Sequence, residues 1–427
     1  EFNHALEYAI GRANDAGQPV LVVFGLMDDY PEANHRHYRF MLEGLQETQR
    51  KLHDCGIQMV VQIGSPDDVA LHLSHDASLV VCDRGYLRHQ RAWRDHVAKA
   101  ASCQVVQVES DVVVPVETVS DHAEFAARTI RPKIHRLWDK FLVPLRRQAV
   151  REDSLGTEFE SESLADLDEL LPRLCFDRTV PPVDRWFRGG THEAKRILRS
   201  FLRRFYEDYA RNRNQPQTDN VSHMSKYLHF GQISPVQIAL SVRRATGRTE
   251  NEESFLEELI VRRELACNFV YFTPDYDRFT CLPRWAKESL SEHKSDRRDP
   301  QYSRAELESA STHDPYWNAA MREMTHTGYM HNYMRMYWGK KILEWSSSPE
   351  YSFRTALELN NKYIVDGRDP KSYAGVAWIF GLHDRAFGER RVFGKIRFMS
   401  ADGLKRKCDI GGYVDKVERL CEAGREG

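Results

Sequence analysis

The chain has 427 residues, enough for two domains that each bury a core of their own. Hydrophobic residues make up 41% and charged residues 29%, as in ordinary soluble globular proteins. No apolar run approaches the ~20 residues of a membrane helix, and we recognise no signal peptide. The eight cysteines form no CxxC pair. This predicts reduced thiols in an intracellular protein, cytoplasmic or nucleoid in a prokaryote and nuclear in a eukaryote, with no zinc or other metal site.

The net charge of −2 hides a segregation of charge along the chain. Residues 152–170 carry eight acidic side chains and no basic one, which indicates a solvated linker. Residues 181–249 carry thirteen Lys and Arg against five Asp and Glu, and residues 384–407 carry eight against three. Local basic surface on a near-neutral protein is typical of a polyanion partner such as nucleic acid. Solvated helix faces give the same pattern, so charge alone leaves both interpretations open.

The first 115 residues alternate between short β-rich runs and helical segments. The predicted strands are 20–26, 57–63, 78–83 and 104–110, and the predicted helices are 34–54, 66–75 and 88–101. Strands that read as continuous apolar runs and alternate with helices indicate a parallel, doubly wound, Rossmann-like sheet. No GxGxxG follows any of these strands, so the usual dinucleotide fingerprint is absent.

The second half of the chain is predicted to be almost entirely helical. The segment 191–213 carries an apolar stripe at helical spacing, and Ser234-Pro235 has the form of a helix start. We therefore predict an α/β domain over 1–115, a linker over 116–180 and an all-helical domain over 181–427.

Two polar motifs in the helical half have the composition of a ligand site. In SHMSKYLHFGQISP, Ser222 and Ser225 precede an apolar run, where hydroxyls and free N–H groups can hold an anion. In LNNKYIVDGRDPKSYAGVAW, the carboxylate of Asp366 could form a bidentate pair with Arg335. The small residues before Trp378 would let a flat ligand approach the backbone. Taken alone, the first motif is explained by an ordinary capped helix, and the second by an ordinary loop followed by a core helix.

Glu258, in FLEELIVRREL, has two possible roles. It can pair with Arg262 at i,i+4, which is usually a surface salt bridge. In a buried pocket the same carboxyl group would have a raised pKa and could donate a proton or a hydrogen bond near neutrality. The sequence does not choose between these roles.

The stretch YMHNYMRMYWGKKILEW, residues 329–345, places Trp338 and Trp345 seven residues apart in one predicted helix. Seven residues is close to two turns, so the two rings share a face about 10 Å apart along the axis. Trp317 belongs to the preceding helix, which Asp314 and Pro315 start and Gly328 ends. A buried core helix has the same pattern, and this stretch alone favours that interpretation.

Taken together, the motifs have a family resemblance. SHMSKYLHFGQISP, FLEELIVRREL, THDPYW with YMHNYMRMYWGKKILEW, DGRDPKSYAGVAW and HDRAFGERRVFGKIR resemble the class II cyclobutane pyrimidine dimer photolyases. The match runs in order over essentially all of 181–410, and the α/β domain is similar to the family's antenna domain. Five ordered motifs are far more specific than any one of them.

The resemblance implies FAD in a folded conformation, active as the fully reduced anion, which on excitation passes an electron to a thymine dimer flipped out of DNA. The implied cofactor-binding residues are Tyr209, Ser222, His223, Met224, Ser225, Arg335, Asn360, Asp366 and Asp369. The implied lesion and DNA contacts are Arg213, Asn214, Glu258, Met336, Trp378, Arg385, Arg390 and Arg391. Glu258 and Asn360, which would face flavin N5, are the implied catalytic residues. Trp338, Trp317 and Trp345 would carry electrons from the surface to resting flavin.

The chain departs from the family pattern at two places. The family begins with a strand, whereas this chain begins with a helix, so we expect a central strand of the first sheet to be missing. Some relatives place a second tryptophan against the lesion where this chain has Arg262. The resemblance also implies an antenna chromophore, such as a deazaflavin or a folate, without assigning one.

We therefore predict a monomeric, FAD-dependent, light-driven enzyme, a deoxyribodipyrimidine photo-lyase that splits cyclobutane pyrimidine dimers in UV-damaged DNA and has no membrane partner. The alternative is a cryptochrome-like flavin photoreceptor without repair activity. Glu258, Trp378 and the basic segment 384–407 favour the enzyme. A flavin-free helical DNA-binding protein is more distant, because it leaves the Arg335/Asp366 pairing and the serine motif unexplained.

Overall fold

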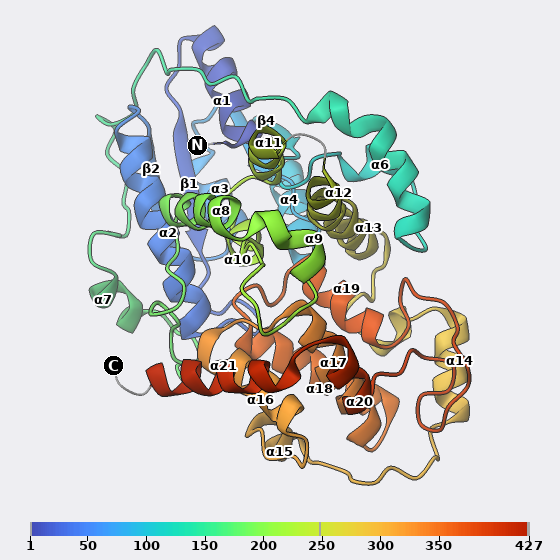
Figure 1. The fold of residues 1–427 in the computed structure, drawn as a ribbon. Coiled ribbons are helices and arrows are strands. Elements are labelled where there is room, and N and C mark those ends of the chain that lie inside the picture. Colours follow the sequence, from blue (N-terminus) through green and yellow to red (C-terminus); the bar gives the residue numbers. More distant parts are fainter. Residues whose placement is uncertain (1, 247–248, 425–427) are drawn as a thin grey trace.

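The computed structural model describes residues 2–246 and 249–424 (Figure 1). Its first part alternates helices and strands, as the sequence predicts. The elements are α1 (His4–Ala16), β1 (Leu21–Leu26), α2 (His35–His53), β2 (Gln58–Ile63), α3 (Pro66–Leu73), β3 (Leu79–Asp83), α4 (Arg88–Ala100) and β4 (Gln104–Val108). Each strand lies within two residues of its predicted bounds, because short β-branched runs between amphipathic helices leave little freedom.

The sheet is divided into two parallel pairs. β1 pairs with β2 in the register Leu21 to Gln58, and β3 pairs with β4 in the register Leu79 to Gln104. Within the described residues no hydrogen-bonded ladder joins β1 to β3. Among the described residues the predicted doubly wound sheet is thus two separate parallel ladders.

The segment after β4 packs into the helical domain. α5 (Val116–Val119) and α6 (Ala127–Phe141) follow it. α6 buries Ile130 and Ile134 in the same core cluster as residues of α11 (Pro235–Thr246) and α12 (Glu250–Leu256). The Glu264 carboxylate accepts from the N–H groups of Val113, at 2.6 Å, and Val114. The domain boundaries stay a prediction, but this part of the predicted linker contributes to the helical core.

The remaining elements are helical, which confirms the predicted fold class of the second half. α7 (Leu167–Leu170) and the 3-10 turn η1 (Leu171–Arg173) precede residue 181, where the helical domain is predicted to begin. Then follow α8 (Thr191–Arg204), η2 (Tyr206–Asp208), α9 (Tyr209–Asn212), α10 (Ser225–His229), α11 (Pro235–Thr246), α12 (Glu250–Leu256), the π-helix η3 (Glu257–Arg262), α13 (Arg263–Phe272) and η4 (Phe279–Cys281). The last are α14 (Arg284–Glu292), α15 (Arg304–Glu308), α16 (Pro315–Thr327), α17 (Asn332–Trp345), α18 (Pro349–Tyr363), α19 (Pro370–Ile379), α20 (Ala401–Lys407) and α21 (Ile410–Ala423). Within the described ranges, none of these helices is long and apolar enough to span a bilayer.

The bounds of α16 follow from local chemistry that the sequence already shows. The Asp314 side chain accepts from the N–H groups of Tyr316 and Trp317, and Pro315 fills the first helical position. Gly328 ends the helix with φ 69°, a left-handed conformation that costs glycine little. The helix therefore places Trp317 at its start, facing α17, while α21 lies along it (Figure 1).

The N-terminal end of α2 joins the α/β domain to the helical domain. Arg36 is buried, and its guanidinium donates to four backbone carbonyls: Pro181, Met324, Thr325 and Tyr363. His37 bonds the Ile364 carbonyl at 3.0 Å. Burial lowers the pKa of Arg36 to about 10, so the group stays charged at neutral pH. These contacts fix the chain that leads from α18 to α19.

Candidate active site

Three tryptophans form a continuous series inside the helical domain. The rings of Trp317 and Trp338 are stacked, with centroids 6.5 Å apart and planes at 11°. The ring of Trp345 meets Trp317 edge-on at 5.7 Å. Trp317 therefore lies between the two tryptophans of α17, and its indole N–H donates to the Trp338 carbonyl at 2.9 Å. An electron can cross this series in steps no longer than one ring contact.

The outer end of the series is covered by two other rings. Trp345 is only 2% exposed, and it contacts Tyr302 at 5.4 Å and His313 at 5.2 Å. His313 is exposed. At the inner end, the indole N–H of Trp338 is buried without a hydrogen-bond partner among the described residues. An electron from an external donor would therefore pass Tyr302 or His313 before it reaches Trp345.

Glu258 lies in the π-helix between α12 and α13. Hydrogen bonds in a π-helix run from i to i+5, so residues five apart come together. Arg262 accordingly pairs with Glu257, with Nε and Oε1 3.0 Å apart. The pair between Glu258 and Arg262, one of the two roles that the sequence left open, is therefore not formed, because i,i+4 pairing requires α-helical geometry. Glu258 pairs instead with Arg213, whose Nη2 lies 2.6 Å from Oε1.

The charge around Glu258 decides its protonation. Burial raises the pKa of Glu258, but Lys371, Arg213 and Arg262 outweigh burial and hold the pKa below its usual value. The expectation of a raised pKa is therefore wrong for the protein without its lesion. At neutral pH this carboxylate is ionised and accepts hydrogen bonds.

Arg335 and Asp366 form no ion pair in this structure, which corrects the predicted direct contact. Asp366 is buried, and its carboxylate has no ion-pair partner within the described residues. A second cation, the fully buried Lys226, lies near both: burial lowers its pKa to about 7, while Asp366 raises and Arg335 lowers it. Its Nζ lies 3.6 Å from the ring centroid of Phe187 and donates to the His223 carbonyl at 3.3 Å. The charge that responds to Asp366 is thus that of Lys226, a residue that the sequence did not assign to this site.

The segments that the sequence assigns to the cofactor carry unpaired polar atoms. Asn360 Oδ1, Arg335 Nε and His223 Nδ1 are buried without a hydrogen-bond partner among the described residues. Leaving a buried polar atom unpaired costs about 1–3 kcal/mol, so such a group indicates a place shaped for a polar ligand. A side chain at Gly375 would meet no other atom within 4 Å, so open space adjoins α19 near Trp378. These residues fit a large, flat ligand with phosphates, such as FAD.

Comparison with known proteins places these features in a family. A sequence profile described as DNA photolyase matches residues 1–151. A deoxyribodipyrimidine photo-lyase from Methanothermobacter thermautotrophicus is 52% identical over 425 residues, which cover 99% of this chain and 92% of that protein. The chain belongs to the DNA photolyases. The resemblance inferred from the motifs is confirmed, and the enzyme is a deoxyribodipyrimidine photo-lyase, a carbon–carbon lyase that repairs DNA in light.

More distant photolyases agree over the same length. The deoxyribodipyrimidine photo-lyase of Arabidopsis thaliana is 38% identical over 429 residues, covering 98% of this chain and 86% of that protein. The crystal structure of a class III photolyase from Agrobacterium tumefaciens superposes with a TM-score of 0.71 at 16% identity. The superposition covers 99% of this chain and 95% of the Agrobacterium tumefaciens protein, which shows that the two share a fold.

The remaining predicted lesion residues of this photolyase divide into two groups. Near the Glu258–Arg213 pair, the Arg262 guanidinium lies over the ring of Trp378, 5.3 Å from its centroid. The Arg262 cation therefore covers Trp378. Asn214 is exposed, and Met336 is partly buried. The exposed arginines of the other group lie on the loop between α19 and α20: Arg385, Arg390 and Arg391.

Three predicted cofactor residues of the photolyase have defined places in the structure. Asp369 accepts from the Lys371 N–H at 2.8 Å as the cap of α19, and its other oxygen bonds His229 at 3.2 Å. Both of its carboxylate oxygens are thus engaged within the protein. Met224 precedes α10, which has only five residues, so an anion there could reach the N–H groups of a single turn. Tyr209 is buried beside the Arg213 guanidinium, 5.8 Å from ring to cation.

Sequence reasoning missed Lys226. The residue is part of SHMSKYLHFGQISP, but a lysine one position past the serines reads as an ordinary exposed helical residue. Only the structure shows that the side chain is buried over Phe187 and that its charge responds to Asp366. Lys371, which lowers the pKa of Glu258, was missed for the same reason.

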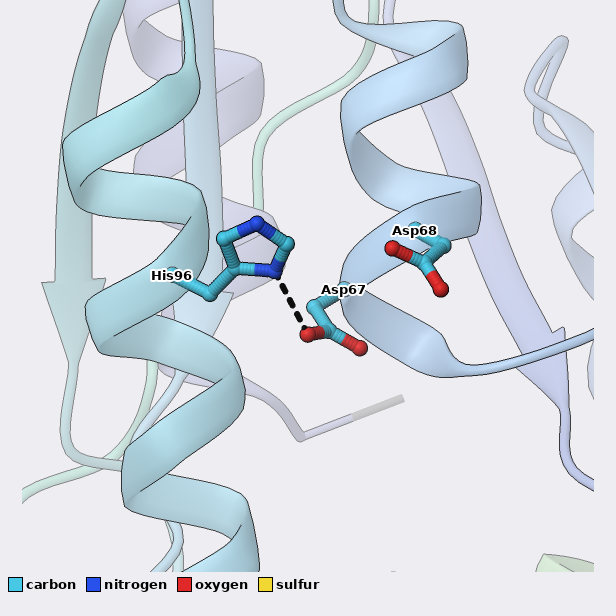
Figure 2. Close-up of side chains that lie close together, drawn as sticks. All are labelled: Asp67, Asp68 and His96. Carbon is cyan, nitrogen blue, oxygen red and sulfur yellow. Dashed lines mark hydrogen bonds and ion pairs between the residues drawn. The ribbon is translucent and has the colours of Figure 1, made fainter.

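In the part of the chain that the structure describes, one group of side chains has the spacing of a cation site. Asp67, Asp68 and His96 each offer a ligand atom, all within 4.8 Å of one another (Figure 2). Only the contact between His96 and Asp67, at 2.8 Å, is a hydrogen bond. Asp68 and His96 are exposed, and the contact between His96 and Asp67 joins α4 to α3. Its geometry is that of an ordinary interhelical ion pair.

Proposed function

We propose that this photolyase binds FAD between the 222–226 segment and the chain from α17 to α19, and splits cyclobutane pyrimidine dimers beside Glu258. FAD, when bound and fully reduced, supplies on excitation the electron that opens the dimer. The protein binds and orients the flavin and the lesion, and it keeps water out. The observation that carries the cofactor assignment is the group of buried, unpaired polar atoms on Asn360, Arg335 and His223.

The proposed flavin contacts follow from charge and hydrogen-bonding capacity. The unpaired Asn360 Oδ1 would accept a hydrogen bond from the N5–H group of a reduced flavin, which would favour the reduced form. Arg335 and Asp366 would contact the flavin ring, and the Arg335 cation would stabilise the negative charge of the reduced form. Ser222, Ser225 and Lys226 face the phosphates, because N–H groups, hydroxyls and one ammonium complement a dianion. Asp369 keeps the loop in place through α19 and His229.

Glu258 and Arg213 form the polar floor of the proposed lesion pocket. Because Glu258 is ionised, it accepts hydrogen bonds from the N–H groups of the thymine bases. Arg213 holds it in position at 2.6 Å. Trp378, covered by Arg262, and Met336 supply the apolar wall on which a flipped dimer can lie, with Asn214 at the edge. A dimer stacks poorly in DNA, so its flipping costs less than that of intact bases.

Trp345, Trp317 and Trp338 are proposed to carry electrons to flavin that has become oxidised. The DNA backbone would contact the basic segment 384–407, including Arg385, Arg390 and Arg391. A monomeric state and an antenna chromophore such as a deazaflavin or a folate in the α/β domain stay predictions.

Absorption and repair test this proposal directly. The purified protein is expected to show bound flavin, and after reduction it should convert thymine dimers in an oligonucleotide to thymines in light but not in the dark. Asn360→Asp, which puts a charge where the reduced flavin carries its proton, should shift the flavin reduction potential. A flavin-containing protein that leaves dimers intact under illumination would support a photoreceptor and contradict the repair assignment.

A further inference from the structure

A cleft of about 620 Å³ lies between the loop after α14 and the loop after α19. Its charged lining residues are Arg297, Arg298, Asp299, Glu344, Arg390 and Arg391. Both acids are already engaged: Asp299 pairs with Arg297 at 2.9 Å, and Glu344 with Lys341 at 2.6 Å. No ion pair neutralises the other three arginines among the described residues. The cleft therefore has a net positive charge, and its volume is in the range of small-molecule sites.

Arg298 differs from the other arginines of the cleft because it is buried. Only 6% of its surface is exposed, and one of its terminal nitrogens donates to the Leu343 carbonyl. Its Nε and Nη2 are buried without a hydrogen-bond partner among the described residues. These two nitrogens form one edge of the guanidinium, the fork that binds two oxygens of a phosphate or carboxylate. Leaving this edge unpaired is costly, so its natural partner is an oxyanion that presents two acceptor oxygens.

The walls of the cleft are fixed before any ligand arrives. His293 bridges two carboxylates, Asp296 at 2.7 Å and Glu389 at 3.0 Å. Asp296 also accepts the Val392 N–H at 2.7 Å. A side chain at Gly394 would collide with Ser289, whose hydroxyl accepts the Lys395 N–H, so the hairpin packs tightly on α14. A preorganised group of cationic side chains loses little entropy when it binds an anion.

We propose that this cleft binds a phosphate group, with the Nε and Nη2 edge of Arg298 as its anchor and Arg297, Arg390 and Arg391 around it. Phosphate is favoured over carboxylate because several arginines converge, and a dianion engages more than one guanidinium. A concave cleft favours a small phosphorylated molecule, and a phosphate of bound DNA has the same chemistry. Leu343 and Glu344 form part of the site, so the anion would lie beside the outer end of the tryptophan series.

Titration with inorganic pyrophosphate tests the site without any light reaction. Calorimetry on the flavin-containing protein at constant ionic strength should show one binding event for the wild type. Arg298→Gln should weaken that binding at least about tenfold, because it removes a charge-assisted bidentate contact. Arg354→Gln is the matched control, since Arg354 is an exposed arginine of α18 that does not line the cleft. It should bind pyrophosphate as the wild type does.

A second variant and a DNA arm complete the experiment. If Arg298→Gln is poorly folded by circular dichroism, the exposed pair Arg297→Gln with Arg391→Gln should still weaken pyrophosphate binding. If pyrophosphate does not bind but Arg298→Gln lowers affinity for undamaged duplex DNA and reduces its salt dependence, the phosphate belongs to DNA. Unchanged pyrophosphate and DNA binding in both variants would overturn the site. Dimer repair by the wild-type protein, measured in parallel, tests the proposed function separately.

Discussion

Replacing Trp338 by phenylalanine separates the relay from a purely structural role of the tryptophan series. Trp338 is 1% exposed and is stacked on Trp317 at 6.5 Å, so the change removes the ring nearest the proposed flavin site. Its indole N–H is buried and unpaired, and thus the substitution breaks no hydrogen bond. Phenylalanine keeps an aromatic ring but loses three ring atoms.

The stability cost is expected to be small. At about 0.8 kcal/mol for each buried methylene-sized group, the lost ring atoms cost roughly 2 kcal/mol. Removing an unpaired buried N–H returns on the order of 1 kcal/mol, so a net loss of about 1 kcal/mol is expected. Truncation to alanine would cost about 3–5 kcal/mol. FAD binding should therefore survive in Trp338→Phe.

Two light-driven activities are then measured on the same protein. Photoreduction of oxidised flavin by an external donor should be blocked in Trp338→Phe, because the electron must cross the missing ring. Repair by chemically pre-reduced enzyme should persist, because its electron does not pass this ring. Trp285→Phe is the matched control: Trp285 packs against the same core but has no ring contact with the series. Normal photoreduction in Trp338→Phe, per bound flavin, would refute the relay.

Three further predictions concern charged groups. Glu258→Gln should retain FAD and lower the repair yield per photon. Because the pKa of Glu258 is lowered, its contribution to folding stability is present above the unfolded pKa and is lost as pH falls through the folded value. Lys226→Met should weaken FAD binding. Because burial lowers the pKa of Lys226 to about 7, the apoprotein's unfolding free energy should rise between about pH 7 and 10, and the variant should lose part of this slope. Two hydrogen-bonded carboxylates raise the pKa of His293. The stability that the protonated His293 gives to the fold is therefore full below about pH 6.5 and is lost as pH rises through the folded pKa. The protection of residues 390–394 against hydrogen exchange should fall over the same pH range.

Each of these predictions has a control or a contrary outcome. Wild-type repair yield in Glu258→Gln would make its carboxylate dispensable. Lys340→Met is the control for Lys226, because Lys340 is equally buried and burial lowers its pKa to about 7, but the charges that act on it are Asp384 and Arg397. Equal losses of FAD in both variants would indicate a general packing effect. If the protection of residues 390–394, corrected for the intrinsic exchange rate at each pH, still changes with pH in His293→Gln, the effect belongs to another group.

The elements of this photolyase were predictable where local chemistry decides them. The strands follow from short β-branched runs, and α16 follows from the cap at Asp314 and the left-handed Gly328. The seven-residue spacing correctly places Trp338 and Trp345 in one helix. That Trp317 fills the space between them depends on how α16 packs on α17, which no local pattern encodes.

The errors concern contacts that depend on more than helical spacing. The π-helix shifted the partner of Arg262 from Glu258 to Glu257, and the sequence gives no sign of a π-helix. The predicted pair of Arg335 with Asp366 assumed two isolated charges, whereas the buried Lys226 is a third. Burial of a lysine cannot be seen from its neighbours in sequence. Such electrostatic details need the packed structure.

The docking of Arg36 has a consequence for chimeric photolyases. A side chain that donates to four backbone carbonyls of the other domain makes the α/β domain part of the frame that holds the 364–368 turn. A proteolytic cut in the exposed chain near residues 142–152 would break the polypeptide but leave both fragments bound to each other. Exchanging α/β domains between relatives would succeed only where the new α2 carries an equivalent donor, since its loss would strand those carbonyls in the interior.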